Sequence, residues 1–248
     1  MERSAKNRYI APRYTMRTAI ISDIHSNLEA LTAVLSMIDA IQPDNILCLG
    51  DIVGYGANPA ECVDLIRARG IPAVCGNHDL GAAGVLEEEQ FSEAARRGLE
   101  WSRKYLSSEQ LEYLRSLPLT IDHPDFKAVH SSPDVPMEFR YLFQPLDAAE
   151  SFDHFSQYLC FVGHTHRPVI FSHAGVEHKI MKDRQYIVNV GSVGQPRDGD
   201  WRGCFVLFDS ERWSVNHVRV EYDNNMARHK IIDAGLPQKL GDRLMVGV

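Results

Sequence analysis

The chain has 248 residues, of which 44% are hydrophobic and 24% charged, and its formal net charge is −7. This length allows one large domain or two small ones, and we expect one. The acidic balance, with both signs interspersed, excludes the basic face that duplex nucleic acid requires. No stretch approaches the apolar length of a membrane span, and the N-terminus lacks the apolar core of a signal peptide. We therefore expect a cytoplasmic protein with no membrane partner.

Residues 1–15 precede any periodic pattern, and we expect this leader to lie outside the fold. The sequence predicts a domain over 16–222 and an extension over 223–248 that packs on the domain or in a subunit contact, so a homo-oligomer is possible. The cysteines are odd in number and have no CxxC spacing, which predicts small buried side chains in a reducing compartment. They are Cys48, Cys62, Cys75, Cys160 and Cys204.

The first third of the chain alternates strand-like and helix-like patterns. Residues 17–22 form a β-branched run, and helical spacing of apolar residues follows over 28–38. A second run covers 45–49 before a helix opened by Pro59, and a third covers 71–75. This alternation predicts right-handed crossovers and a parallel sheet. Polar residues follow the three runs: Asp23 with His25, Asp51, and Asn77 with His78.

The remainder of the chain changes character. Residues 87–116 have a helical pattern, in which Ser107 and Gln110 form a capping box that starts a second segment. Short alternating runs between 119 and 220 predict a second sheet, mixed or antiparallel, with one helix near 147–158. Three more polar clusters follow such runs: His130, His164 with His166, and the loop 191–197 with Arg197.

These polar clusters contain the residue types that bind metal ions. In an extended segment the side chains at i and i+2 point the same way, so each paired cluster directs two ligands to one place. Imidazole, carboxylate and amide oxygen without thiolate suit Mn, Fe, Zn, Ni or Co. Seven such groups exceed one tetrahedral zinc and fit two divalent ions that share Asp51. They are Asp23, His25, Asp51, Asn77, His130, His164 and His166.

In order and spacing, these motifs resemble those of the calcineurin-like metallophosphoesterases, and most closely the small bacterial and archaeal phosphodiesterase branch. The resemblance covers about residues 17–219. It implies an α/β fold, a four-layer α/β/β/α sandwich with two mixed sheets and a dinuclear centre at the strand ends. The motifs are Asp23-Ile24-His25, Gly50-Asp51, Gly76-Asn77-His78-Asp79, a lone His130 and Gly163-His164-Thr165-His166.

The resemblance also implies roles for these residues. Asp51 bridges both ions and is part of the catalytic centre, while His78 is the catalytic histidine that binds no metal. His78 would protonate the leaving oxygen or stabilise the transition state. Asn77 and Arg197 are the expected substrate contacts, with Arg197 as a phosphate clamp. The implied ligands are Asp23, His25, Asp51 and His166 for the first ion, and Asp51, Asn77, His130 and His164 for the second.

The implied activity is that of a metal-dependent phosphoesterase that hydrolyses a small phosphorylated substrate, with nucleotides among the candidates, by in-line attack of a metal-bridging hydroxide. We expect phosphodiesters to be preferred. Protein phosphatases of this superfamily carry an acid and then an arginine after the bridging aspartate, where this chain has Gly54 and Tyr55. The missing acid leaves open which group orients His78, and Asp79 is the adjacent candidate.

Several alternatives stay open at this point. A phosphomonoesterase, including a protein phosphatase, and a dinucleoside polyphosphate hydrolase would use the same centre on other substrates. A nuclease would need a path for nucleic acid, and a non-catalytic scaffold would use the fold alone. Arg140 and Tyr141 are further candidates for the cleft.

Overall fold

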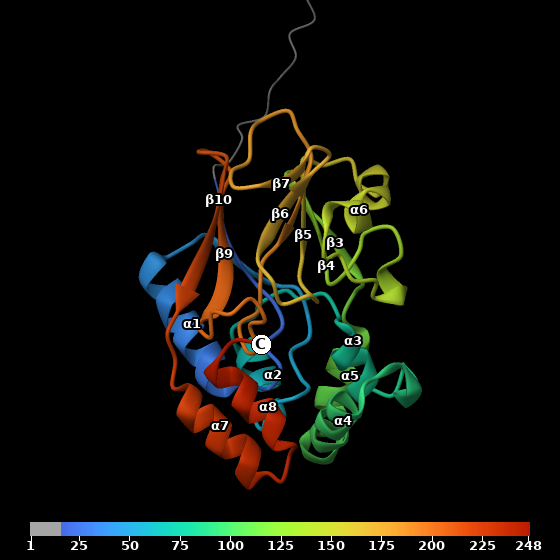
Figure 1. Ribbon diagram of the computed structural model, residues 1–248, viewed down its shortest axis with the longest axis vertical. Helices are drawn as coiled ribbons and strands as arrows, with labels where there is room; N and C mark the ends of the chain where they lie inside the picture. The colour runs from blue at the N-terminus through green and yellow to red at the C-terminus, as the bar shows by residue number, and fades with distance from the viewer. Residues whose placement is uncertain (1–15) are drawn as a thin grey trace, which may run out of the picture.

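The computed structural model describes residues 16–248, so the predicted leader lies outside the described residues. Two mixed sheets lie face to face with helices on their outer sides (Figure 1). The first sheet has the order β10 (Ser214–Val220), β9 (Gly203–Asp209), β1 (Arg17–Ile21) and β2 (Asn45–Cys48). The second has the order β3 (Thr120–Asp122), β4 (Phe126–Val129), β5 (Leu159–Val162), β8 (Tyr186–Asn189), β6 (Val169–Ser172) and β7 (Gly175–Glu177).

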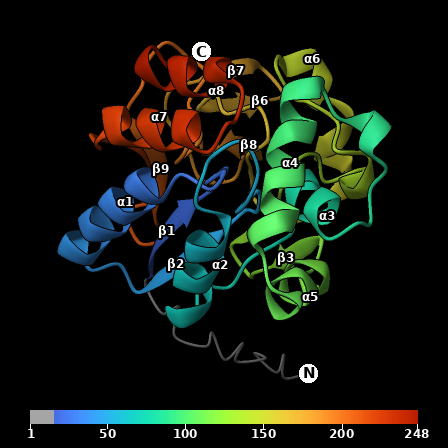
Figure 2. The ribbon, with the colours of Figure 1, turned by 90° about the horizontal axis from the view of Figure 1, so that it is seen from below.

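Helices complete the outer layers and one end of the sandwich. Seen from below, α7 and α8 lie to one side with α1, and α4 and α5 lie to the other (Figure 2). The α-helices are α1 (Leu28–Ile41), α2 (Pro59–Ala68), α3 (Asn77–Ala82), α4 (Glu93–Tyr105), α5 (Ser108–Ser116), α6 (Pro145–Ala148), α7 (Asn224–Asp233) and α8 (Gln238–Asp242). The 3₁₀ helices are η1 (Glu88–Gln90), η2 (Pro136–Glu138), η3 (Glu150–His154) and η4 (Arg243–Met245).

The strand sequences explain the layers. Along β1, Ala19 and Ile21 pack in the apolar cluster under the helices, whereas Ile20 packs in the cluster between the sheets. In β5, Phe161 faces the other sheet and Cys160 packs in the outer cluster with Phe152 of η3. Since successive strand side chains point to opposite faces, a strand buried on both faces needs a continuous apolar run. The predicted four-layer α/β/β/α fold with two mixed sheets is confirmed.

Several details of the predicted fold are wrong. Strands β9 and β10 were expected in the second sheet, but β9 pairs antiparallel with β1 and makes the first sheet mixed. Residues 71–75 form a single bridge, Ala73 with Cys48, because Pro72 has no N–H to donate to a ladder. The helix expected from residue 87 begins at Glu93 after the short η1, and that expected near 147–158 is replaced by α6 and η3.

The extension over 223–248 packs on the domain. Ala227 and Ile231 of α7, with Leu240 and Leu244 beyond it, belong to the same apolar cluster as α1. The backbone N–H of Gly199 donates to the Gly247 carbonyl at 2.9 Å, which ties the chain end to the loop after the last site cluster. All five cysteines are free and buried, as predicted. Within residues 16–248, no helix is long and apolar enough to cross a membrane.

Candidate metal centre and active site

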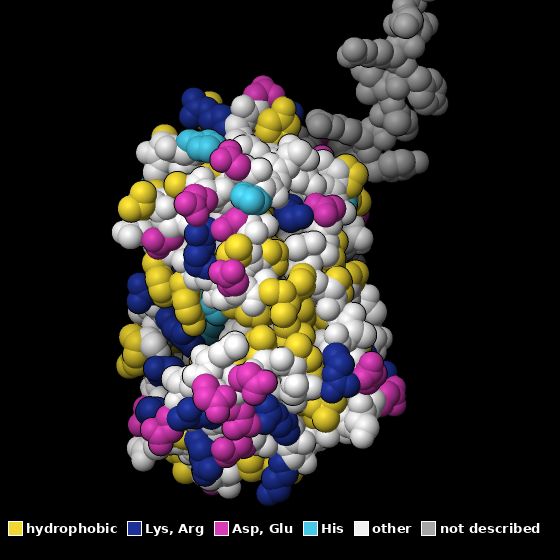
Figure 3. Space-filling view, turned by 90° about the vertical axis from the view of Figure 1, so that its right-hand side faces the viewer, with side chains coloured by type: hydrophobic (Ala, Val, Ile, Leu, Met, Phe, Trp, Pro, Cys, Tyr) yellow, Lys and Arg dark blue, Asp and Glu magenta, His cyan; other side chains and the backbone are white. Residues whose placement is uncertain are grey.

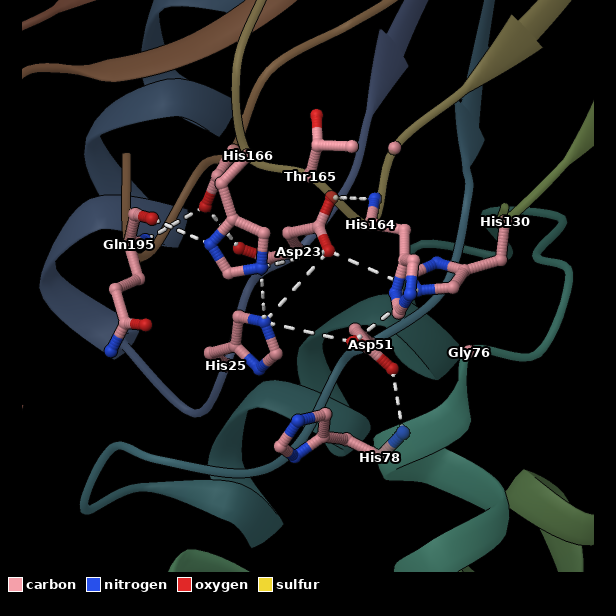
Figure 4. Close-up of polar contacts among 12 residues, drawn as sticks. Asp23, His25, Asp51, Gly76, His78, His130, His164, Thr165, His166 and Gln195 are labelled. Carbon is pink, nitrogen blue, oxygen red and sulfur yellow. Dashed lines mark hydrogen bonds and ion pairs between the residues drawn. The ribbon is translucent and has the colours of Figure 1, made fainter. Parts of the chain in front are cut away.

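The predicted site residues meet where the two sheets present the carboxyl ends of their strands (Figure 4). Asp23 and His25 follow β1, and Asp51 follows β2. His130 follows β4, while His164 and His166 follow β5. Asn77 and His78 open α3. The histidines and the two aspartates are all nearly or fully buried.

The backbone at these positions is not extended, contrary to the prediction. Asp23, His25, Asp51, His164 and His166 all have positive φ, between 50° and 65°. This left-handed region is costly for most side chains, and Asp and His are among those that enter it more often. The side chains of each pair nonetheless point to one place, because tight turns rather than strand pleats aim them.

Two glycines allow the site segments to approach each other. A Cβ on Gly76 would overlap the Asp51 carboxylate, and a Cβ on Gly163 would overlap Ser22 and the Asp23 carboxylate. The backbone can therefore pass directly beside both acids only where there is no side chain. The carboxylates use this closeness: the His78 N–H donates to Asp51 at 2.8 Å, and the His164 N–H donates to Asp23 at 3.0 Å.

One group of metal-capable atoms lies around Asp23. Its Oδ1 atom is 3.3 Å from His166 Nε2 and 3.8 Å from His25 Nε2, and the two Nε2 atoms are 3.0 Å apart. The ligand atoms of these three residues all lie within 4.8 Å of one another.

A second group lies around Asp51. His130 Nε2 is 3.3 Å from Asp51 Oδ2 and 3.2 Å from His164 Nδ1. Asp51, His130 and His164 also meet within 4.8 Å, and Asp51 Oδ2 is 3.6 Å from His25 Nε2 of the first group. Asp51 thus lies between the two groups.

The imidazoles are oriented as metal ligands. The Nδ1 atoms of His25, His130 and His166 contact the backbone carbonyls of Val53, Leu49 and Gln195 at 3.1, 2.7 and 2.6 Å. A carbonyl only accepts, so each Nδ1 carries the proton and each Nε2 of a neutral ring is left with its lone pair. His25 and His166 then direct two lone pairs at each other across 3.0 Å. A cation between them removes that repulsion.

Orphaned atoms support the same assignment. Among the described residues, Asp23 Oδ1 and Asn77 Oδ1 are buried without a hydrogen-bond partner. Leaving such groups unpaired is costly unless a ligand satisfies them. The donor set therefore fits one divalent ion at each group, and the unpaired Asn77 oxygen is available as a further ligand.

The histidines of the site differ in the direction in which their surroundings shift the pKa. Burial lowers the pKa of His78 to about 4 and holds that of His25 below its usual range. Burial opposes protonation of His130 too, but the Asp51 carboxylate outweighs it and raises the pKa to about 9. Burial also raises the pKa of Asp51, yet the charge of His130 and its hydrogen bond to Asp51 hold this pKa well below its usual range.

Asp79 was the sequence candidate for the group that orients His78, but it is not hydrogen-bonded to the His78 ring. Its carboxylate accepts from the backbone N–H groups of Ile52, Val53 and Gly76 at 2.9, 3.2 and 3.0 Å. Asp79 therefore ties the loop after Asp51 to the start of α3. Within residues 16–248, His78 Nδ1 has no hydrogen-bond partner.

Aromatic rings hold His78 instead. The Tyr55 ring lies 4.5 Å from that of His78 and 4.6 Å from that of His25, between ring centroids, and Phe91 touches His78 edge-on at 5.5 Å. The Arg197 guanidinium lies over the Tyr55 ring, 5.6 Å from the ring centroid. Sequence reasoning missed Tyr55 as a site residue. Its only signal was its position four residues after the bridging acid.

Arg197 stands at the edge of this centre. It donates to the Gln195 side chain at 2.7 Å, and its backbone N–H donates to the His166 carbonyl. Its charge contributes to the lowered pKa of His166, after burial. Burial and the same charge lower the pKa of Arg243 in η4, so the C-terminal extension brings a second guanidinium toward this edge.

The two remaining candidates behave differently. Tyr141 stacks on His164 with centroids 4.0 Å apart and planes at 22°, and it belongs to the site. The Arg140 guanidinium is paired with Asp134 at 2.6 Å and with Glu150 at 3.2 Å, so its charge is already neutralised.

Comparison with known proteins gives consistent results. A family model described as the calcineurin-like phosphoesterase superfamily domain matches residues 16–212. An uncharacterized protein of Methanocaldococcus jannaschii is 43% identical over 239 residues, which cover 92% of this chain and 97% of that protein. The range 16–212 spans the positions of all the predicted site residues.

Solved structures show the same fold. The crystal structure of a metallophosphoesterase from Sphaerobacter thermophilus is 40% identical, with a TM-score of 0.83 over 95% of this chain and 100% of that one. A hypothetical protein from Pyrococcus horikoshii is 24% identical, with a TM-score of 0.80 over 94% of this chain and 98% of that one. Both similarities extend past residue 212 into the C-terminal extension.

Proposed function

The chain belongs to the calcineurin-like phosphoesterase superfamily, and from this premise we propose that it is a dinuclear metal-dependent phosphodiesterase acting on a small phosphorylated substrate. The observation that carries the proposal is the placement of Asp51 between two groups of buried ligands. A centre of two ions that share a carboxylate matches the usual arrangement for phosphate ester hydrolysis.

The metal ions would be Mn, Fe, Zn, Ni or Co, held by Asp23, His25 and His166 on one side and by Asn77, His130 and His164 on the other, with Asp51 common to both. When bound, two such ions supply Lewis-acid activation of water and neutralise phosphoryl oxygens.

The chain's own residues would do the rest. His78, with a pKa lowered to about 4 by burial, is neutral near pH 7 and can donate a hydrogen bond to a phosphoryl or leaving oxygen. Tyr55 and Phe91 fix the plane of its ring. Arg197 would clamp the phosphate, since its side chain stands at the open edge of the centre. Asn77 would contact substrate beside its ion.

A metal and activity measurement tests the proposal. We expect about two transition-metal ions per chain by mass spectrometry, and hydrolysis of bis(p-nitrophenyl) phosphate after loading with Mn²⁺. Chelation is expected to abolish hydrolysis and to lower the melting temperature, because a ligand that binds only the folded state stabilises it. Full activity in metal-stripped protein contradicts the proposal.

Preference for diesters is a separate part of the proposal. It depends on Gly54 and Tyr55, which replace the acid and arginine expected of a protein phosphatase. A panel of p-nitrophenyl phosphate, phosphopeptides and dinucleoside polyphosphates, measured beside the diester, distinguishes the alternatives. A higher kcat/KM for any of these overturns the preference while leaving the metal centre intact.

A further inference from the structure

A cavity opens beside the second group of ligands. It has a volume of about 700 Å³, in the range of small-molecule sites, and Asn77 and His164 line its inner end. Figure 3 faces this side of the molecule, and a histidine is partly visible there in a hollow bordered by hydrophobic and basic side chains. A substrate whose phosphate reaches the ligands would place its next chemical group in this cavity.

Half of the residues that line the cavity are aromatic or aliphatic, and they form an apolar wall. Phe91 lies before α4 and Phe139 after η2, while Tyr141 extends from its stack on His164. Leu86 and Met137 complete the apolar lining. Tyr141 and Met137 are each 45% exposed and line the same cavity, so a ligand bound there would cover both side chains.

The charges of the cavity favour a neutral occupant over an anionic one. Its one guanidinium, that of Arg140, is already paired with Asp134 and Glu150. The Glu138 carboxylate lines the same cavity and would repel a second phosphate, while Gln90 offers both a donor and an acceptor. The occupant that fits is neutral, flat and aromatic, with a hydrogen-bonding edge.

We propose that this cavity holds the base of a nucleoside esterified to the phosphate at the metal centre, so that the substrate is a nucleotide diester. The inference rests on the proposed function for the placement of the phosphate. It adds the class of the second substituent and the residues that select it, Phe91, Met137 and Tyr141. The fold supplies these from the segment before α4 and from the segment around η2.

Two esters with the same leaving group test the proposal. Thymidine 5′-(p-nitrophenyl) phosphate and methyl p-nitrophenyl phosphate both release p-nitrophenolate, so their kcat/KM ratio reports only the second substituent. Stacking of one base predicts a ratio of about ten or more. Tyr141→Ala and Met137→Ala should each lower the ratio, and Met181→Ala, which truncates a methionine 54% exposed elsewhere, should not.

Failure of the inference is distinguishable from failure of the proposed function. A ratio near one with both esters hydrolysed overturns the nucleoside site and leaves the phosphodiesterase standing. The assignment to a nucleoside is also overturned if phenyl p-nitrophenyl phosphate shows as large an increase in kcat/KM over the methyl ester as the thymidine ester does. If neither ester is hydrolysed, calorimetric binding of thymidine 5′-phosphate and methyl phosphate to Mn²⁺-loaded protein decides, and equal affinities overturn the inference.

Discussion

The floor and the rim of the site are built in different ways. The floor consists of buried acids and imidazoles, most of which are oriented by backbone carbonyls and N–H groups, whereas aromatic rings hold His78. The rim consists of partly exposed side chains that are held mainly by contacts between rings and cations. The floor is Asp23, His25, Asp51, His78, His130, His164 and His166, and the rim is Tyr55, Tyr141 and Arg197. The difference indicates that backbone groups position most of the candidate metal ligands, while contacts between side chains position the rim.

The largest expected effect is that of Asp51→Asn in the floor. Because Asp51 lies between both ligand groups, its loss should reduce the metal content to less than one ion per chain and the diesterase kcat/KM by at least about 1,000-fold. Mass spectrometry of the purified protein measures the metal. Asp153→Asn, on the exposed surface, is the control and should retain both ions. Retention of two ions in Asp51→Asn would contradict the proposal that Asp51 is a ligand of both ions.

His78→Ala should separate catalysis from metal binding. We expect kcat to fall by about 100- to 10,000-fold with the metal content unchanged, because His78 is predicted to donate to the reacting oxygens and not to an ion. His154→Ala is the matched control at an exposed position. Loss of an ion together with activity would instead make His78 a ligand, as its closeness to His25 and Asp51 would also permit.

Arg197→Ala tests the rim. Loss of a charge-assisted contact to phosphate predicts a rise in KM of about tenfold or more, with a smaller change in kcat and no loss of metal. Arg197→Lys should recover only part of the affinity, since lysine lacks the planar fork of donors. Steady-state kinetics with the diester give both constants. An unchanged KM in Arg197→Ala would remove this residue from the rim.

Tyr55→Ala should have the smallest effect of the four. Its ring supports His78 and lies under Arg197, so we expect kcat/KM to fall about three- to tenfold. Tyr55→Phe keeps the ring and should behave as the unmodified protein. Equal losses in both variants would show that the hydroxyl, rather than the ring, is needed.

The same contrast explains what the sequence could predict. The floor residues occur in short motifs directly after apolar runs, so strand ends and metal chemistry together bring Asp23, Asp51 and His164 into one site. In the rim, Arg197 and Tyr141 were predicted as candidates, but Tyr55 was not, because it acts through its contacts with His78 and Arg197, which the sequence does not show. Likewise, the partner of β9 could not be predicted, since its pairing with β1 joins segments almost 190 residues apart.

The position of Asp79 beside His78 in the sequence suggested an orienting role that the structure does not show. An Asp next to a catalytic histidine is a reasonable orienting group, but Asp79 is turned away by the start of α3 and accepts three backbone N–H groups. The direction in which a side chain points from the first helical turn depends on the residue at which the helix begins. The first residue of a helix is the part of a secondary-structure prediction that is least reliable.

The pairing of β1 with both β2 and β9 has a consequence for biosynthesis. The ribosome releases β1 first, yet one of its two edges stays open until residues 203–209 have emerged. His166 must also meet His25, 141 positions earlier, before the first group of ligands exists. Nascent chains stalled before residue 166 are therefore expected to lack the first metal group, and those stalled before residue 203 to expose the β1 edge to neighbouring polypeptides.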